Sequence, residues 1–299
     1  MNVSDLKAVS VEALELSIEG IDFAKAKAIY EEHGALVLRG VAREYAARIL
    51  VDMEEVLAQA TAQLPEATPH PVHKNAWVTP NGSAFNDDPD HPGHKVVNTL
   101  KFNGLVSGVF TESLMNPKLL DVVETLIGPD IELWKWGQCV YKQPESGLPK
   151  SMHQDEYYFQ HKYNTTVGVL TYAIDTDETN GALQVVPGSH KLGPIEHGDD
   201  TFAGFQLDDS WFGRAALIPG KAGDAILFNG LTIHGSLSNR SSRPRPVFIQ
   251  RYRAAYDFCI HDVGNTEDRK KAEANPRTEK APDDQGLMVR GLRRTAPGQ

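Results

Sequence analysis

The chain has 299 residues, 40% of them hydrophobic, and its 40 acidic and 30 basic residues give a formal net charge of −10 at pH 7. A surface of this charge repels a phosphate backbone, and no stretch approaches the roughly 18 uninterrupted apolar residues of a membrane span, so neither nucleic acid nor a membrane is expected as a partner. Cys139 and Cys259 lie far apart without a CxxC partner, which argues against a thiolate metal site and fits a reducing cytoplasm. No signal peptide is visible, because the first thirty residues lack a basic start followed by an apolar run.

The first third of the chain is expected to be mostly helical. Asp22 can cap a helix that Gly34 ends, and a short apolar strand is expected directly afterwards at 35–38. A second helix is predicted over 43–64 and a third over 117–127, because apolar residues recur there at helical spacing and turn residues stand at the ends.

Residues 65–100 are dense in proline, glycine, asparagine and aspartate, which are the residues of turns. A plain connection of this length is uncommon in a folded domain, so we expect a loop that covers a substrate. The segment also holds four histidines, for which solvated loop positions are the default expectation: His70, His73, His91 and His94.

From residue 131 the pattern changes to short β runs separated by turn residues. Strands are predicted at 133–142, 165–174, 182–186, 225–228, 231–236 and 246–255. Such a series is typical of a sandwich or jelly roll and not of alternating βα units. We therefore predict a mainly β chain with flanking helices, forming one domain over residues 1–299. Its jelly-roll core is expected at about 131–258, with a helical buttress and lid at 1–130 and a C-terminal tail at 263–299.

A candidate metal site starts from His153 and Asp155. In an extended chain, residues two apart point to the same face, so this imidazole and this carboxylate can meet one ion. His234, on a later β run, is the best candidate for a third ligand, whereas His190 follows a Pro-Gly-Ser turn and is expected to be structural. Two imidazoles and one carboxylate leave three positions of an octahedral ion open, as in non-haem iron(II) sites that bind an organic chelator and dioxygen.

Arg245 follows His234 by eleven residues, near the start of a predicted strand. Its guanidinium can bind a carboxylate through two parallel hydrogen bonds. If 2-oxoglutarate chelates the iron through its 1-carboxylate and 2-keto oxygen, such an arginine can neutralise the distal 5-carboxylate.

Several ordered motifs between residues 152 and 252 resemble the phytanoyl-CoA dioxygenase family of iron(II)/2-oxoglutarate oxygenases. They are the His-Gln-Asp run at 153–155, Pro-Gly-Ser-His at 187–190, Ala-Gly-Asp to Phe at 222–228, and His-Gly-Ser at 234–236 followed by Arg245. The resemblance implies a double-stranded β-helix, a cupin-like jelly roll. It also implies Fe(II), 2-oxoglutarate and O₂ as cofactor and co-substrates.

In this family the usual reaction is hydroxylation of a C–H bond, with release of succinate and CO₂, and a small-molecule metabolite is the expected substrate. By resemblance, His153, Asp155 and His234 would be the catalytic metal ligands. Arg245 and Gln138 would bind oxoglutarate, and Gln154 and Thr171 would line the same pocket. Related halogenases replace the carboxylate ligand with a small residue, so Asp155 argues against halogenation.

Other hypotheses on the reaction and on the class of protein remain open at this point. Desaturation, epoxidation and cyclisation can start from the same hydrogen abstraction. The chain can also be a metal-dependent jelly-roll enzyme that does not use oxoglutarate, or a non-catalytic jelly roll that binds a ligand. The substrate and the oligomeric state are not encoded in any motif, so a homo-oligomer is compatible with the sequence.

Overall fold

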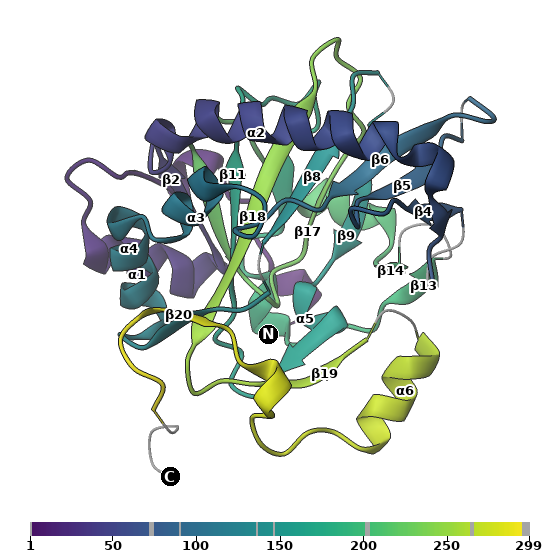
Figure 1. Ribbon diagram of the computed structural model, residues 1–299. Helices are drawn as coiled ribbons and strands as arrows, with labels where there is room; N and C mark the ends of the chain where they lie inside the picture. Colours follow the sequence, from purple (N-terminus) through teal and green to yellow (C-terminus); the bar gives the residue numbers. More distant parts are fainter. Residues whose placement is uncertain are drawn as a thin grey trace.

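The computed structural model of the protein describes residues 2–71, 75–89, 91–135, 137–145, 147–200, 204–263 and 266–294. Within this part of the chain, a large and a small β-sheet pack against each other, and helices cover the other face of the large sheet (Figure 1). This arrangement confirms the predicted mainly β jelly roll with flanking helices.

The large sheet has twelve strands, ten of them in the order β1-β2-β16-β11-β18-β8-β6-β5-β4-β3. Its central strands are antiparallel, and β7 and β20 extend it beside β18. The bounds are β1 Glu15–Ser17, β2 Ala35–Arg39, β3 Thr68–Pro69, β4 Ala76–Val78, β5 Ala84–Asp87, β6 Lys95–Leu100, β7 Ile131–Leu133, β8 Gln138–Lys142, β11 Val167–Tyr172, β16 Ala225–Asn229, β18 Arg245–Ala254 and β20 Leu287–Arg290.

The small sheet has the order β15-β12-β17-β9, so β9 is an edge strand. Two two-stranded antiparallel sheets complete the strands, one of β10 with β19 and one of β13 with β14. The bounds are β9 Lys150–His153, β10 Phe159–His161, β12 Leu183–Val185, β13 Gly198–Asp200, β14 Gly204–Gln206, β15 Ala216–Ile218, β17 His234–Ser236 and β19 Cys259–Asp262.

The longer helices form where caps and apolar periodicity coincide. Asp22 accepts a hydrogen bond from the Lys25 amide at the start of α1, and Gly34 ends that helix in the left-handed conformation. Figure 1 shows α2 lying across the large sheet. The α-helices are α1 Phe23–His33, α2 Arg43–Ala62, α3 Gly108–Leu114, α4 Pro117–Ile127, α5 Asp155–Tyr158 and α6 Thr266–Ala274, and the 3₁₀ turns are η1 Val3–Asp5, η2 Val11–Ala13, η3 Leu64–Glu66, η4 Ser189–Leu192, η5 Asp209–Arg214 and η6 Pro282–Asp284. Among the described residues, no helix is both long and apolar enough to cross a membrane.

The large sheet buries both of its faces. On β11, Val169 packs in the layer between the sheet and the helices, together with Met53 of α2. Its neighbour Leu170 packs between the two sheets, together with Leu183 of β12. Because side chains alternate along a strand, a strand covered on both faces is apolar at nearly every position, which explains the continuous hydrophobic run at 167–172.

The N-terminal part of the chain differs from its prediction. Residues 65–100 are not a plain loop, because β3, β4, β5 and β6 form an antiparallel meander that joins the large sheet through β8. Residues 1–130 therefore contribute six strands as well as helices, and the large sheet extends beyond the expected core of 131–258. The sequence did not predict these short strands, because strands of two to six residues carry little periodicity and the proline, glycine and asparagine of the turns between them indicated a loop.

The C-terminal segment is tied to the core by buried charges. Arg253 Nε donates to Glu132 Oε1 at 2.6 Å, and its Nη1 donates to Asp284 Oδ1 at 3.2 Å. Asp284 also accepts hydrogen bonds from the Trp134 indole and the Cys259 amide, both at 2.9 Å. A buried ion pair is stable only when its hydrogen bonds are satisfied, so this carboxylate holds the segment around residue 284 against β18 and β19.

Replacing Asp284 with alanine is expected to lower the free energy of unfolding by about 3 kcal/mol, because Arg253 loses one of its two buried carboxylate partners. Urea denaturation followed by circular dichroism measures this change. Asp283→Ala is the matched control. Asp283 is the exposed neighbour and pairs with Arg277 at the surface, so its loss should cost about 0.5 kcal/mol or less. Equal losses in the two variants would contradict the assigned role of Asp284.

Candidate metal and oxoacid site

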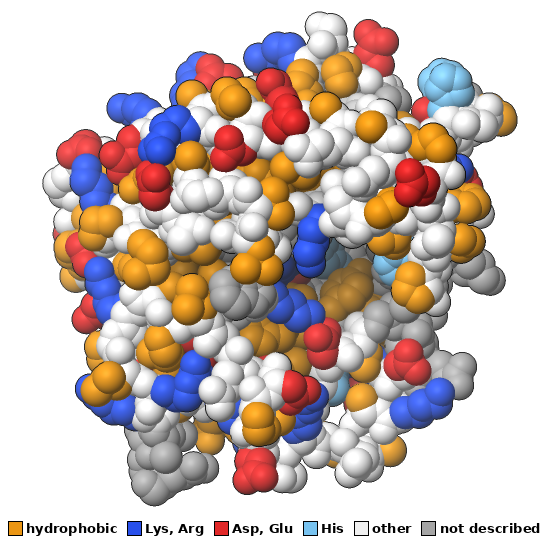
Figure 2. Space-filling model, viewed as in Figure 1, with side chains coloured by type: hydrophobic (Ala, Val, Ile, Leu, Met, Phe, Trp, Pro, Cys, Tyr) orange, Lys and Arg blue, Asp and Glu red, His pale blue; other side chains and the backbone are white. Residues whose placement is uncertain are grey.

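A cavity of about 620 Å³ lies between the two sheets, within the usual range of ligand pockets. Its walls include Leu170, Phe228 and Ile249 of the large sheet and Leu183 and His234 of the small sheet. Figure 2 shows a hollow near the centre of the face, where hydrophobic, cationic and histidine side chains meet. Such a mixture of apolar walls and a few polar groups is typical of a small-molecule site.

His153, Asp155 and His234 meet at this cavity. His153 on β9 and His234 on β17 are direct cross-strand partners, and their ring centroids lie 4.3 Å apart. Asp155 is the first residue of α5, and its Oδ1 lies 3.7 Å from His153 Nε2 and 3.9 Å from His234 Nε2. One potential ligand atom from each of the three residues lies within 4.8 Å of the others, and these are separations that a single ion can bridge.

Backbone carbonyls orient both imidazoles. The Nδ1 of His153 lies 2.8 Å from the Ser151 carbonyl oxygen, and the Nδ1 of His234 lies 2.9 Å from the Thr232 carbonyl oxygen. If each Nδ1–H donates to its carbonyl, each Nε2 keeps a lone pair that points toward Asp155. Burial, with a smaller effect of the neighbouring His153, lowers the pKa of His234 to about 4, so this ring is neutral near pH 7 and able to bind a metal.

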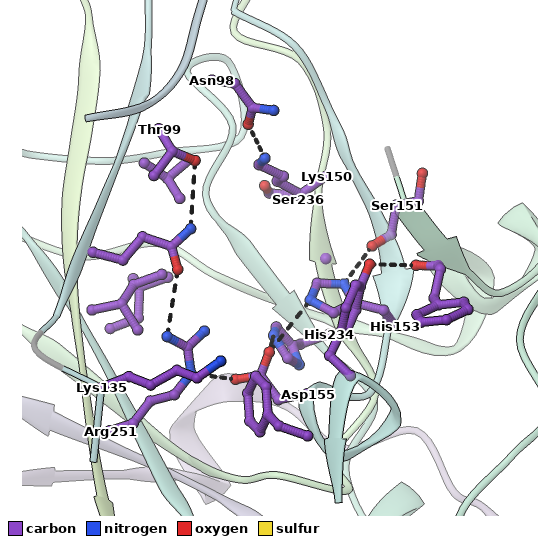
Figure 3. A pocket seen from close by; sticks show the side chains of 18 of the residues that line it. Asn98, Thr99, Lys135, Lys150, Ser151, His153, Asp155, His234, Ser236 and Arg251 are labelled. Carbon is purple, nitrogen blue, oxygen red and sulfur yellow. Dashed lines mark hydrogen bonds and ion pairs between the residues drawn. The ribbon is translucent and has the colours of Figure 1, made fainter. Parts of the chain in front are cut away.

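The two oxygens of Asp155 face different groups. Oδ1 lies toward the histidines, whereas Oδ2 accepts a hydrogen bond from Arg251 Nε at 3.0 Å (Figure 3). Burial by itself would raise the pKa of Asp155, but the charge of Arg251 and the hydrogen bond with His153 outweigh it and hold the pKa well below its usual value. The carboxylate is therefore ionised and oriented before any ion binds.

Arg245 lies in the same cavity and is almost fully buried, with 1% of its surface exposed. Its Nε and Nη2 have no hydrogen-bond partner among the described residues. The Tyr172 ring lies below the guanidinium, 5.6 Å from its central carbon. Burial lowers the pKa of Arg245. A buried cation with two unsatisfied donors is costly, and a carboxylate of a bound ligand would supply the missing acceptors.

The other predicted site residues separate into two groups. Gln138 lines the cavity, and its side chain lies 3.4 Å from both Thr99 Oγ1 and Arg251 Nη1. Thr171 and Gln154 do not line it. Thr171 pairs with Phe248 and Ala225 on the helix-covered side, opposite to Leu170.

Gln154 is completely buried and joins its own segment to the segments around residues 193–195 and 231. Its Nε2 donates to the carbonyl oxygens of Gly193 and Leu231 at 2.9 and 2.8 Å, and its Oε1 accepts from the Ile195 amide at 2.8 Å. His190, the rival ligand, lies outside the cavity lining, with its Nε2 3.2 Å from the Glu31 carbonyl oxygen. His73 lies outside the described residues.

Sequence reasoning missed a group of cavity residues. The 65–100 meander contributes His70, Ala76, Ala84, Asn98 and Thr99, so this segment does cover part of the cavity, as expected. Lys135, Lys150 and Ser236 also line it. Lys150 stands three residues before His153, a spacing that places the two side chains on opposite faces of a regular strand, so the sequence contained no signal for it.

Comparison with known proteins agrees with this geometry. Residues 30–247 match the family described as phytanoyl-CoA dioxygenase. The chain is 36% identical over 170 residues to the peroxisomal phytanoyl-CoA dioxygenase of Bos taurus, which covers 52% of this chain and 50% of that protein. It is 25% identical over 171 residues to the L-proline trans-4-hydroxylase of Streptomyces griseoviridis, which covers 49% of this chain and 63% of that protein. The chain thus spans about half the length of the bovine relative.

Solved structures show the same fold. The epimerase SnoN, in complex with Fe³⁺, alpha ketoglutarate and nogalamycin RO, superposes with a TM-score of 0.59 at 20% identity, over 91% of this chain and 96% of that one. A non-heme monooxygenase, ThoJ, superposes with a TM-score of 0.60 at 19% identity, over 91% of this chain and 84% of that one. At this identity the likeness shows the fold alone. Because the family match covers well over half of the residues, the chain belongs to the phytanoyl-CoA dioxygenase family.

Proposed function

We propose that the protein is a non-haem iron(II)/2-oxoglutarate dioxygenase that hydroxylates a C–H bond of a small-molecule metabolite. The proposal rests on the observation that two features lie in the same cavity. One is the His153, Asp155 and His234 cluster, and the other is Arg245, a buried guanidinium with two unpaired nitrogens. A metal enzyme that does not use an oxoacid would have no need for the second feature.

In this proposal the three clustered side chains hold the iron and Arg245 holds the distal carboxylate of oxoglutarate. Two neutral imidazoles and one carboxylate leave an iron(II) site with a net charge of +1, which favours an anionic chelator. When bound, the iron and oxoglutarate would reduce O₂, placing one oxygen atom in the product and the other in succinate, with loss of CO₂. The donor set and the unpaired guanidinium both fit these groups.

The remaining cavity residues position the metal ligands and shield the site from water. Arg251 keeps Oδ2 of Asp155 hydrogen-bonded, so that Oδ1, which faces the histidines, would be the oxygen that binds the iron. Leu170, Leu183 and Ile249 form an apolar wall that excludes water from the site. We further propose that the chain acts as one catalytic unit, because strands from both halves of the chain line the cavity. We also propose a cytoplasmic location, because the two cysteines of the chain are buried free thiols.

The direct test is oxoglutarate turnover. Purified protein with iron(II), ascorbate and a metabolite library is expected to release succinate with one class of compound, and mass spectrometry should find a product heavier by one oxygen. Protein that retains no metal and releases no succinate with any compound would favour a ligand-binding jelly roll. Metal-dependent activity without any need for oxoglutarate would instead favour another jelly-roll enzyme.

Replacing Asp155 with alanine is expected to weaken binding of Mn²⁺, a redox-stable substitute for iron(II), by about 100-fold or more. Losing a residue that merely supports a ligand costs about 10–100-fold, and Asp155 is proposed to be a ligand itself. Isothermal titration of metal-free protein measures the affinity. His190→Gln is the control and should bind like the unmodified protein, because His190 lies outside the cavity. Unchanged affinity in Asp155→Ala would refute the ligand assignment.

Replacing Arg245 with glutamine is expected to raise the dissociation constant for oxoglutarate by at least about 30-fold. The reason is that truncating one partner of a buried, hydrogen-bonded charge pair costs about 2–5 kcal/mol. The constant is measured by titrating oxoglutarate into protein loaded with Mn²⁺. Arg243→Gln is the matched control, because this exposed arginine pairs with Asp177 at the surface. A similar loss in both variants would show a general charge effect and not a carboxylate site.

A further inference from the structure

The cavity carries more positive charge than the proposed function needs. Among the described residues, four basic side chains line it, Lys135, Lys150, Arg245 and Arg251, against two carboxylates, Asp155 and Asp262. Four minus two leaves an excess of two positive charges. Iron(II) and the oxoglutarate dianion cancel each other, so the excess remains after both have bound. This cavity lies in a protein whose formal net charge is −10.

Three of the four basic groups have an acidic partner within the proposed site. Lys135 Nζ lies 2.9 Å from Asp262, and Arg251 Nε lies 3.0 Å from Asp155. Arg245 is assigned to the distal carboxylate of oxoglutarate. Lys150 is different, because its ammonium hydrogen-bonds to the side-chain oxygen of Asn98 and has no carboxylate within ion-pair distance among the described residues.

The path of β9 explains why Lys150 reaches the cavity. Its cross-strand partner is Ser236, whereas the partner of His153 is His234, so three steps on β9 match two steps on β17. This β-bulge brings Lys150 to the same face as His153, although their spacing predicts opposite faces. Figure 3 shows Lys150 beside Asn98 and Ser236, away from the group formed by Lys135, Asp155 and Arg251.

Lys150 bridges the edge of the small sheet and the meander that extends the large sheet. Asn98 belongs to β6, and its own amide nitrogen donates to Asn86 Oδ1 at 2.8 Å, which fixes the oxygen toward Lys150. Burial lowers the pKa of Lys150 to about 8, as expected for an ammonium without a counter-ion. An anion bound here would restore the missing charge partner.

We propose that Lys150, oriented by Asn98, binds the carboxylate of the substrate, which is an anionic molecule with an apolar body. This inference rests on the proposed function and adds the substrate class to it. The ammonium supplies a point charge for the carboxylate, while Ala76 and Ala84 of the meander and Phe205 of β14 offer apolar surface to the rest of the molecule. Hydroxylation would then occur at a carbon set at a defined distance from that carboxylate.

The test uses pairs of probes that differ only in charge: phenylacetate with phenylacetamide, and hexanoate with hexanamide. They are titrated into protein loaded with Zn²⁺ and oxoglutarate. This complex cannot catalyse the reaction, so only binding is measured. The unmodified protein should bind at least one carboxylate about tenfold more tightly than its amide, as expected for a hydrogen bond between charged groups. Lys150→Met should bind the two members of that pair within about twofold, whereas Lys150→Arg should keep most of the preference.

Lys135→Met is the matched control. This lysine lines the same cavity but already has Asp262 as its partner, so its loss should leave the tenfold preference within about twofold of its original value. Thermal unfolding of each variant checks that the fold is intact. A preference that falls equally in both lysine variants would reflect the general potential of the cavity and would overturn the assignment to Lys150.

Two further results would also overturn it. One is the absence of a carboxylate preference in the unmodified protein for every pair. The other is a loss of oxoglutarate affinity in Lys150→Met as large as that in Arg245→Gln, which would assign Lys150 to the co-substrate. Zn²⁺ and then oxoglutarate are first titrated into metal-free protein. Failure to bind them contradicts the proposed function, whereas a lost carboxylate preference contradicts only the Lys150 site.

Discussion

An ionised side chain between two packed sheets costs several kcal/mol unless a group of opposite charge and enough hydrogen bonds accompany it. This constraint decides where the interior charges of this protein lie. At one end of β18, Arg253 is satisfied by Glu132 and the C-terminal segment, so its role is structural. Further along the same strand, Arg251 is satisfied by Asp155. Arg245 at the start of the strand has two unpaired nitrogens, and an unpaired buried charge is the mark of a ligand position.

The pairing of β9 with β17 is the second constraint, because it connects distant parts of the chain at atomic scale. It sets His153 directly opposite His234, and the chain then turns into α5 so that Asp155 completes the cluster. Since β9 is an edge strand, a bulge there disturbs no further neighbour, and the bulge turns Lys150 into the cavity. The meander of β3 to β6 then covers this open side of the jelly roll, which is why an N-terminal segment supplies Asn98 and Thr99 to the site.

Local patterns in the sequence determined much of this architecture. Caps and apolar periodicity predicted α1 and α4, because helix ends leave backbone groups that only certain residues satisfy. Alternation along an extended chain predicted that His153 and Asp155 share a face, although Asp155 begins α5, and the same alternation places Arg245 and Arg251 on one face of β18. The same alternation directs Gln154 away from its two neighbours, so its absence from the cavity follows from the sequence pattern. Thr171 was different, because β11 is buried on both faces and its pattern does not show which face is the cavity.

What the sequence determined by itself is therefore the class of fold, the bounds of α1 and α4 and most of α2, and the types of residue that can bind a metal and an oxoacid, since all of these depend on short-range spacing. Tertiary structure alone decided which of these residues share a cavity with the 65–100 meander, and that Lys150 lies beside them. Those outcomes depend on the register between β9 and β17 and on the pairing of β6 with β8, which join segments far apart in the sequence. Spacing along the chain does not encode such register, because cross-strand pairing and packing of both sheets select it together.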